Sequence, residues 1–177
     1  QELEFEIVSN SNPSLFAASP AIDAEGVLSY RPLPNAHGSA MVEVRLLDDG
    51  GVANGGLPMS AVKTFEIKIT KPFPWHNTRH ALDVTGKDGV PDQKVTGGDA
   101  LAVINYINAF GQLKVPAGAT PGPPYLDAAN RTSNAADNLV SAADALAIIN
   151  FINAFGSALP GPAGESVSAE PRSAYDL

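Results

Sequence analysis

Apolar and polar residues alternate with a period of two along much of the first seventy residues. The pattern is typical of strands that bury one face, and the segments between its runs are rich in Gly, Asn, Pro and Ser, which favour turns. The runs are LEFEIV (Leu3–Val8), GVLSYRP (Gly26–Pro32), AMVEVRLLDD (Ala40–Asp49) and KTFEIKIT (Lys63–Thr70). We therefore predict an all-β, Ig-like sandwich domain over residues 1–70.

This β-domain is short for its class. Its four clear strands are fewer than the ~7 of an Ig-like sandwich, and the chain opens almost inside a strand. We expect residues 1–70 to be part of a sandwich whose first strands precede them. The next segment, KPFPWHN at residues 71–77, is punctuated by proline and is predicted to be a linker.

The hydrophobic period changes after this linker, where one segment occurs twice. DALAVINYINAFG (Asp99–Gly111) and DALAIINFINAFG (Asp144–Gly156) differ at only two positions. In each copy, apolar residues recur every three or four positions, which predicts an amphipathic helix. Each copy ends on a glycine, which suits a helix C-terminus. Asp99 and Asp144 stand where the helices begin and are candidates for their N-caps.

The duplication sets the boundaries of the second half of the chain. The duplicated module spans residues 78–156. Within it, repeat one covers 82–111, a connection covers 112–124, and repeat two covers 125–156. The connection has four prolines and is not expected to be helical. Residues 157–177 are rich in Ser, Pro, Ala and Glu and are predicted to be a flexible tail.

The acidic residues of the duplicated module are all aspartates. Between Trp75 and Gly156 the chain has seven acids and no Glu among them. Glu favours helix more than Asp does, so aspartates set among Gly, Asn, Thr and Ser indicate loops whose short carboxylates converge. These residues are Asp83, Asp88, Asp92, Asp99, Asp127, Asp137 and Asp144.

The two copies fit one metal-binding frame. In an EF-hand-type calcium loop, side chains at positions 1, 3, 5 and 12 and the carbonyl of position 7 supply oxygens, and the chain turns at position 6. Asp92 precedes Asp99 by seven residues, and Asp137 precedes Asp144 by seven, which is the separation of positions 5 and 12. The frame also assigns the turn of position 6, the carbonyl of position 7 and the apolar residue of position 8. These are Gln93, Lys94 and Val95 in loop one, and Asn138, Leu139 and Val140 in loop two.

These repeats resemble the bacterial dockerin type I module, two tandem calcium loops of the form D-x-N-x-D-G-x-V-x-x-x-D-A-L, each followed by an apolar helix. The matching residues are LDV…KVTGGDALAVINYIN (Leu82–Asn108) and YLDA…NLVSAADALAIINFIN (Tyr125–Asn153), with the lead-ins PWHN and PPYLD. The resemblance covers about residues 75–156. It implies a small all-α module with two calcium ions, placed behind a cadherin-like or Ig-like domain in a multidomain protein.

The resemblance also implies a ligand set. Asp83 and Asp127 would be the first ligands, Asp92 and Asp137 the middle ones, Asp99 and Asp144 the closing, bidentate ones, and Lys94 and Leu139 the carbonyl donors. Position 1 should stand eleven residues before position 12, but Asp83 stands 16 before Asp99 and Asp127 stands 17 before Asp144. Each loop therefore carries an insertion of five or six residues.

The insertions leave part of the ligand set open. Thr85 and Asn130 are candidates for position 3. Asp88, eleven residues before Asp99, is an alternative first ligand of loop one. Loop one has four acids and loop two has three, so we expect loop one to bind calcium more tightly.

The near-identity of the helices predicts an approximate two-fold axis. We expect the helices to pack through Leu101, Ile104, Leu146 and Ile149. Two similar outer surfaces would then be left for a partner, one centred on Val103 and Tyr106 and the other on Ile148 and Phe151.

Composition excludes several classes of function. The net charge of −8 argues against nucleic-acid binding, and no apolar run reaches the ~18 residues of a membrane span. The three histidines are scattered and no G-x-S-x-G motif occurs, so we expect no enzymatic activity.

The resemblance implies a calcium-binding module of a secreted or bacterial cell-surface protein, attached to a cohesin-like domain or to neighbouring surface domains. The alternative is a purely structural, calcium-stapled segment of an adhesion or stalk protein.

Two simpler interpretations apply to particular motifs. The repeated helix could be plain core with the aspartates as caps only, but this does not account for the aspartates seven residues upstream. DDGG (Asp48–Gly51) could be a further calcium site, as at cadherin junctions, and we favour a strand-ending turn there.

Overall fold

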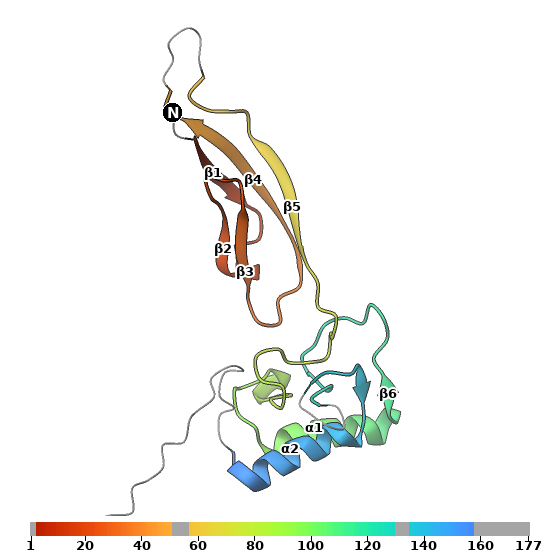
Figure 1. Cartoon of the computed structure of the whole chain (residues 1–177). Coiled ribbons are helices and arrows are strands. Elements are labelled where there is room, and N and C mark those ends of the chain that lie inside the picture. The colour runs from red at the N-terminus through yellow and green to blue at the C-terminus, as the bar shows by residue number, and fades with distance from the viewer. Residues whose placement is uncertain (1–2, 51–56, 130–134, 158–177) are drawn as a thin grey trace, which may run out of the picture. The chain divides into compact units, whose positions relative to one another are not determined.

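The computed structural model describes residues 3–50, 57–129 and 135–157. The chain divides into two compact units, Gln1–Pro74 and Trp75–Leu177 (Figure 1). The division falls within the predicted linker. The predicted tail lies outside the described residues except for its first residue, Ser157.

The first unit has two antiparallel sheets (Figure 1). One has the strand order β1-β4-β5, with β1 at Leu3–Asn10, β4 at Gly38–Asp48 and β5 at Lys63–Ile69. The other pairs β2, Phe16–Ile22, with β3, Leu28–Pro32. A short 3-10 helix, η1 at Pro13–Leu15, lies between β1 and β2. The alternating pattern of the sequence does not predict β2, because FAASPAI has four small residues and a proline between Phe16 and Ile22.

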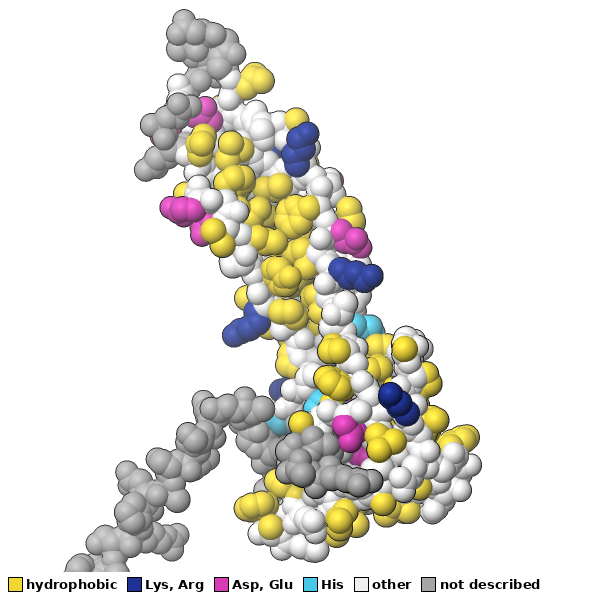
Figure 2. All heavy atoms as spheres, turned by 45° about the vertical axis from the view of Figure 1, so that its right-hand side comes forward, with side chains coloured by type: hydrophobic (Ala, Val, Ile, Leu, Met, Phe, Trp, Pro, Cys, Tyr) yellow, Lys and Arg dark blue, Asp and Glu magenta, His cyan; other side chains and the backbone are white. Residues whose placement is uncertain are grey.

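The core of the first unit is small. It consists of the buried residues Leu15, Phe16, Ala40, Val42 and Ile67. Ala40 and Val42 alternate with exposed neighbours on β4, as expected for a strand with one buried face. Figure 2 shows further apolar side chains gathered along one face of this unit. The described part of the unit is all-β and is compatible with an Ig-like class.

The described part of the second unit holds two α-helices of fourteen residues, α1 at Gly97–Phe110 and α2 at Ala142–Phe155. They pack against each other (Figure 1). A two-residue ladder pairs β6, Leu113–Lys114, with β7, Leu139–Val140. Repeat one also contains a 3-10 turn, η3, at Lys87–Gly89.

The prediction of a small all-α module is wrong. The chain is mixed and mostly β, with 24% of residues helical and 30% in strands, and unit 2 itself contains the β6–β7 ladder. The physical reason is that the proline-rich connection after α1 runs as extended backbone at Leu113–Lys114, whose polar groups need partners. β6 in the connection pairs with β7 in loop two, and the amide of Val115 donates to the carbonyl of Asn138 at 2.7 Å beside this ladder.

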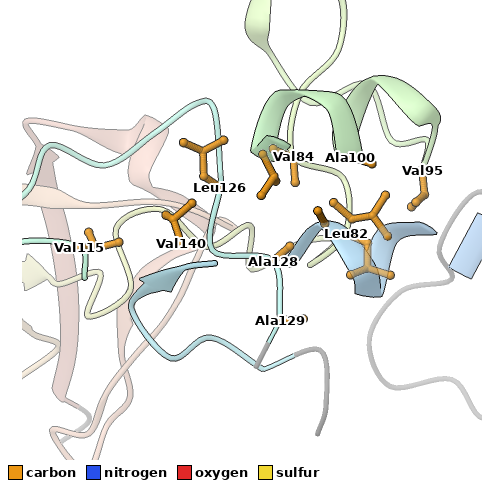
Figure 3. Packing of buried hydrophobic residues seen from close by; sticks show 12 residues of the cluster. Leu82, Val84, Val95, Ala100, Val115, Leu126, Ala128, Ala129 and Val140 are labelled. Atoms are coloured by element: carbon orange, nitrogen blue, oxygen red, sulfur yellow. The ribbon is translucent and has the colours of Figure 1, made fainter. Parts of the chain in front are cut away.

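The core of unit 2 is built from equivalent residues of the two repeats. Val84, Val95, Val103, Val140 and Ile148 are fully buried. Val95 and Val140 are the predicted apolar residues of position 8, and Val103 and Ile148 occupy the same place on the two helices. Figure 3 shows part of this cluster, in which side chains from both repeats meet. Duplication of the sequence thus produces one shared core.

No helix within the described ranges combines the length and the apolar character that crossing a bilayer requires.

Candidate functional site

Four aspartates of unit 2 are almost completely buried. Asp83 and Asp99 in repeat one are each 1% exposed, and Asp127 and Asp144 in repeat two are 0% exposed. A carboxylate is rarely buried to this degree unless it is paired. Among the described residues, no lysine or arginine forms a salt bridge with any of the four. Their partners are backbone amides instead.

In repeat one, the first aspartate binds the middle of the loop. Asp83 Oδ1 accepts from the amide of Asp92 at 3.2 Å, and Oδ2 accepts from the amide of Gln93 at 2.8 Å. Asp92 Oδ1 in turn accepts from the amide of Lys94 at 3.1 Å. Gln93 has a left-handed φ of 66°, so the predicted turn at position 6 is present. Asp83, and not Asp88, therefore receives the amides of positions 5 and 6.

Repeat two has the same arrangement. Asp127 Oδ1 accepts from the amide of Asp137 at 3.2 Å, and Oδ2 accepts from the amide of Asn138 at 2.9 Å. Asp137 Oδ1 accepts from the amide of Leu139 at 2.9 Å. Asn138 has a φ of 58°, so the second predicted turn is also present. The first and middle aspartates have equivalent places in both repeats.

The closing aspartate of repeat one lies in the first turn of α1. Thr96 is the N-cap of α1 and Asp99 is the third helical residue, so the two residues form a capping box. Asp99 Oδ2 accepts from the amide of Thr96 at 2.8 Å and from its hydroxyl at 3.1 Å. Asp99 Oδ1 accepts from the amides of Val84 at 2.8 Å and Thr85 at 2.9 Å.

The closing aspartate of repeat two repeats this geometry. Asp144 Oδ2 accepts from the amide and the hydroxyl of Ser141, at 2.8 and 3.2 Å, and Ser141 is the N-cap of α2. Asp144 Oδ1 accepts from the amides of Ala128 at 2.7 Å and Ala129 at 2.9 Å. The sequence signal for these N-caps is the T-x-x-D and S-x-x-D spacing. Asp99 and Asp144 are therefore not the N-caps themselves.

The electrostatics of the cluster disfavour ionised carboxylates. Burial is the main cause that raises the pKa of Asp83, to about 6, and the charges of Asp99 and Asp92 raise it further, against the amide of Gln93, which lowers it. Burial also raises the pKa of Asp127 and of Asp144 above the ordinary value. A cation that neutralised these groups would therefore relieve part of the cost of burying them.

The remaining predicted ligands lie in different surroundings. Asp88 is exposed in η3, with a φ of 62°. Thr85 is half-buried and donates its amide to Asp99. The side chain of Lys94 is exposed and Leu139 is part of β7. Asn130 lies outside the described residues.

Calcium fits some of these carboxylates better than others. Each carboxylate oxygen has two lone pairs, so Asp83 and Asp127 keep one on each oxygen after accepting their two amides. Asp99 and Asp144 each accept four hydrogen bonds and keep none. In the described ranges, no group of three or more His, Cys, Asp or Glu side chains, those of Asp83 and Asp127 included, is arranged so that it could hold a metal ion.

Several residues that tie the loops together are not among the predicted site residues. Asn77 is 2% exposed and donates from Nδ2 to the carbonyl of Asp83 at 2.8 Å. Trp75 Nε1 donates to the carbonyl of Thr120 at 3.1 Å, and His76 Nδ1 lies 2.7 Å from the carbonyl of Asp127. The last three residues of the predicted linker are therefore integral to unit 2. The lead-in PWHN is the signal that pointed to them.

The predicted partner surface needs correction. Val103 and Ile148 are 0% exposed and belong to the core, and Tyr106 and Phe151 are half-buried against it. Tyr106 contacts Trp75 edge to face, with ring centroids 5.7 Å apart. Neither Val103 nor Ile148 is therefore available to a partner.

The predicted helix–helix contact through Leu101 and Leu146 is also wrong, since these residues are 54% and 55% exposed. The reason lies at the helix starts. Asp99 must face inward to reach its loop, and residues four and seven or eight positions later share its side of the helix. Val103 is thereby buried and Leu101 is turned outward.

The DDGG segment behaves as a turn in its described part. Asp48 Oδ1 accepts from the amide of Gly50 at 2.7 Å, two residues further on. This is the local bond by which an aspartate favours a turn, as predicted for the end of β4. Gly51 lies outside the described residues.

The chain matches no protein-family model, no curated protein and no solved structure. The case for a function therefore comes from the repeated geometry of the loops and from the exposed faces of the helices.

Proposed function

We propose that unit 2 is a non-catalytic, calcium-binding attachment module of a secreted or cell-surface protein, which docks a cohesin-like domain. The observation that carries the proposal is the repeated loop geometry. In both repeats a buried first aspartate accepts the amides of positions 5 and 6, and position 6 is left-handed. An EF-hand-type loop likewise has an oxygen ligand at position 1 and a sharp turn at position 6.

The charge balance of repeat one supports an ion. Asp83 is buried close enough to Asp99 and Asp92 for their charges to raise its pKa. Unpaired buried charges are costly, and a divalent cation would offset this charge. Calcium is a hard cation that takes oxygen ligands. Asp83, Asp92 and the carbonyl of Lys94 would hold it, with the exposed Asp88 adding to the local negative potential.

Repeat two offers an equivalent set with one acid fewer. Asp127, Asp137 and the carbonyl of Leu139 would hold the second ion. Because fewer carboxylates generally weaken calcium binding, loop two is the weaker site. Calcium bound in either loop would connect the first aspartate of that loop to the middle one and would neutralise the charge of both.

The exposed faces of the helices support attachment to a protein partner. Leu101 and Leu146 occupy equivalent positions and are 54% and 55% exposed, and Phe110 and Phe155 are 72% and 70% exposed. Apolar side chains exposed at equivalent positions of the two helices give both helices a similar surface for a partner. The near-equality of the two faces favours a partner that engages either one. The docking face of each helix is defined here by its exposed leucine, Leu101 on α1 and Leu146 on α2.

Two titrations of the full chain test the proposal. Calorimetric titration with calcium should show two sites in the wild-type chain and no binding in the Asp92→Asn/Asp137→Asn variant. Titration with cohesin-type domains should then show calcium-dependent binding. Two calcium sites without any cohesin-type partner would favour the purely structural, stalk-like alternative, and absence of both would refute the proposal.

A further inference from the structure

The closing aspartates connect two parts of the chain that are distant in sequence. Asp99 takes two donors from the start of its loop, Val84 and Thr85, and two from the helix N-cap, Thr96. All four distances lie between 2.8 and 3.1 Å. The carboxylate of Asp99 therefore fastens the first residues of the loop to the N-terminus of α1 without any other group between them.

This geometry differs from that of a metal ligand in a specific way. A bidentate calcium ligand presents a lone pair of each oxygen to the ion, at ~2.3–2.6 Å. Four hydrogen bonds occupy all four lone-pair sites of Asp99. Coordination of calcium by Asp99 would thus require at least two of its donors to be released, and those amides are buried or half-buried. An amide buried without a partner is costly.

The same arrangement recurs where the surrounding sequence differs. Asp144 also takes two amides from the start of its loop and both donors of its N-cap. The two loops differ in length by one residue, 16 against 17 from first to closing aspartate, and Thr96 is replaced by Ser141. The bonding is nevertheless identical, so it is a property of both repeats.

We propose that Asp99 and Asp144 are metal-independent clamps that close their loops onto the helices and do not coordinate the ion. The helix pair and its core then fold without calcium. The binding of calcium itself rests on the function proposed above. The ion binds only to the first and middle aspartates and to the carbonyl of position 7. Calcium would bridge the first and middle aspartates of a loop and would not be required for the core.

Unfolding of the full chain in chelator and in calcium tests the proposal. Trp75 is the only tryptophan and lies in unit 2, so its fluorescence reports on this unit within the intact protein. Asp99→Asn keeps the size of the side chain but loses two acceptor sites and turns an NH2 group toward N–H donors. Asp92→Asn is the matched control, because its Oδ1 still accepts from the amide of Lys94.

The two roles of Asp99, clamp or calcium ligand, predict opposite effects of its substitution on the melting temperature in chelator. We expect Asp99→Asn to lower the melting temperature by about 10 °C, as loss of bonds to a charged acceptor does in a domain of this size. Asp92→Asn should leave that melting temperature unchanged or slightly raise it, because it removes a like charge from near Asp83. If Asp99→Asn instead leaves or raises the melting temperature and abolishes the calcium-induced rise, Asp99 is a ligand and the proposal is refuted.

Hydrogen exchange of the wild-type chain gives a second measurement that needs no variant to fold. The amides of Val84, Thr85, Ala128 and Ala129 should be protected in chelator. Protection that develops only after calcium is added would overturn the proposal. A wild-type chain that shows protected amides but no calcium-induced change would leave the clamps in place and refute only the calcium part of the proposed function.

Discussion

The backbone amide of Tyr125, at the start of repeat two, donates to the carbonyl of Val84, at the start of repeat one, at 2.9 Å. The amide of the same Val84 donates to Asp99 in its own repeat. The amide of Asp127 likewise donates to the carbonyl of Trp75 at 2.9 Å. The repeats are thus joined through the beginnings of their loops as well as through their helices, and unit 2 should unfold as one cooperative unit.

A substitution in the core of one repeat should therefore destabilise the other repeat as well. Ile148→Ala should lower the free energy of unfolding by about 2–4 kcal/mol, because Ile148 is fully buried. Leu146→Ala, two residues away on α2 and largely exposed, is the control and should cost much less. Urea unfolding followed by the fluorescence of Trp75, at the start of unit 2, measures both. Two separate transitions would contradict the coupling of the repeats.

Gly86 should be intolerant of a side chain. A Cβ added there would lie 2.4 Å from the carbonyl oxygen of Val90 and 2.8 Å from Cβ of Asp92. We expect Gly86→Ala to destabilise unit 2 by about 1–3 kcal/mol, as overpacking does, and to weaken calcium binding by moving Asp92. Gly97→Ala, where nothing lies within 4 Å, is the matched control. Equal melting temperatures for the two variants would disprove the steric argument.

The stability of unit 2 in chelator should increase on mild acidification. The pKa of Asp83 is raised by burial from 3.8 to about 6 in the folded chain, and the pKa values of Asp127 and Asp144 are raised in the same direction. A raised folded pKa means that the folded state binds the proton more tightly than the unfolded state does. The resulting stabilisation is complete below about pH 4 and is lost as the pH rises through about 6.

Melting curves at pH 7.5 and pH 5 measure this effect. In chelator, the melting temperature should be higher at pH 5, and Asp83→Asn should reduce the difference. In calcium, the order should reverse, because protons compete with the ion for the same carboxylates. A melting temperature that falls on acidification in chelator would show that the buried aspartates do not control the pH dependence.

Substitutions on the docking face should affect partner binding without affecting stability. If the partner engages either helix, Leu101→Ala or Leu146→Ala alone should weaken binding only about twofold, since one of two equivalent bound states remains. The double variant should nearly abolish binding. Calorimetric titration with the cohesin-type domain measures the affinities, and Met41→Ala, an exposed residue of unit 1, is the control. Complete loss of binding in either single variant would show that only one face is used.

The sequence predicts the helices and the loop turns but not the rotation of the helices. The positions of α1 and α2 follow from their periodicity, and the turns at Gln93 and Asn138 follow from the calcium-loop frame. The buried side of α1 does not follow, because Leu101 is as apolar as Val103 and both sides of the helix are hydrophobic. The hydrogen bonds of Asp99 decide it, and they join segments fifteen residues apart.

The all-α prediction was wrong for a related reason. The ladder between β6 and β7 has only two residues in each strand, which is too short to give an alternating pattern. It forms because the connection after α1 needs partners for its backbone and loop two supplies them. Such pairing depends on the tertiary arrangement and leaves no local trace in the sequence.

The five inserted residues of loop one, 87–91, lie between points that different carboxylates hold. Asp99 fixes the residues before them and Asp83 fixes the residues after them. The length of the inserted segment therefore does not enter the geometry of loop closure, and loop two accommodates one residue more. This segment is accordingly a natural acceptor for a grafted peptide, and a position at which related chains can diverge in length while the helix pair keeps its register.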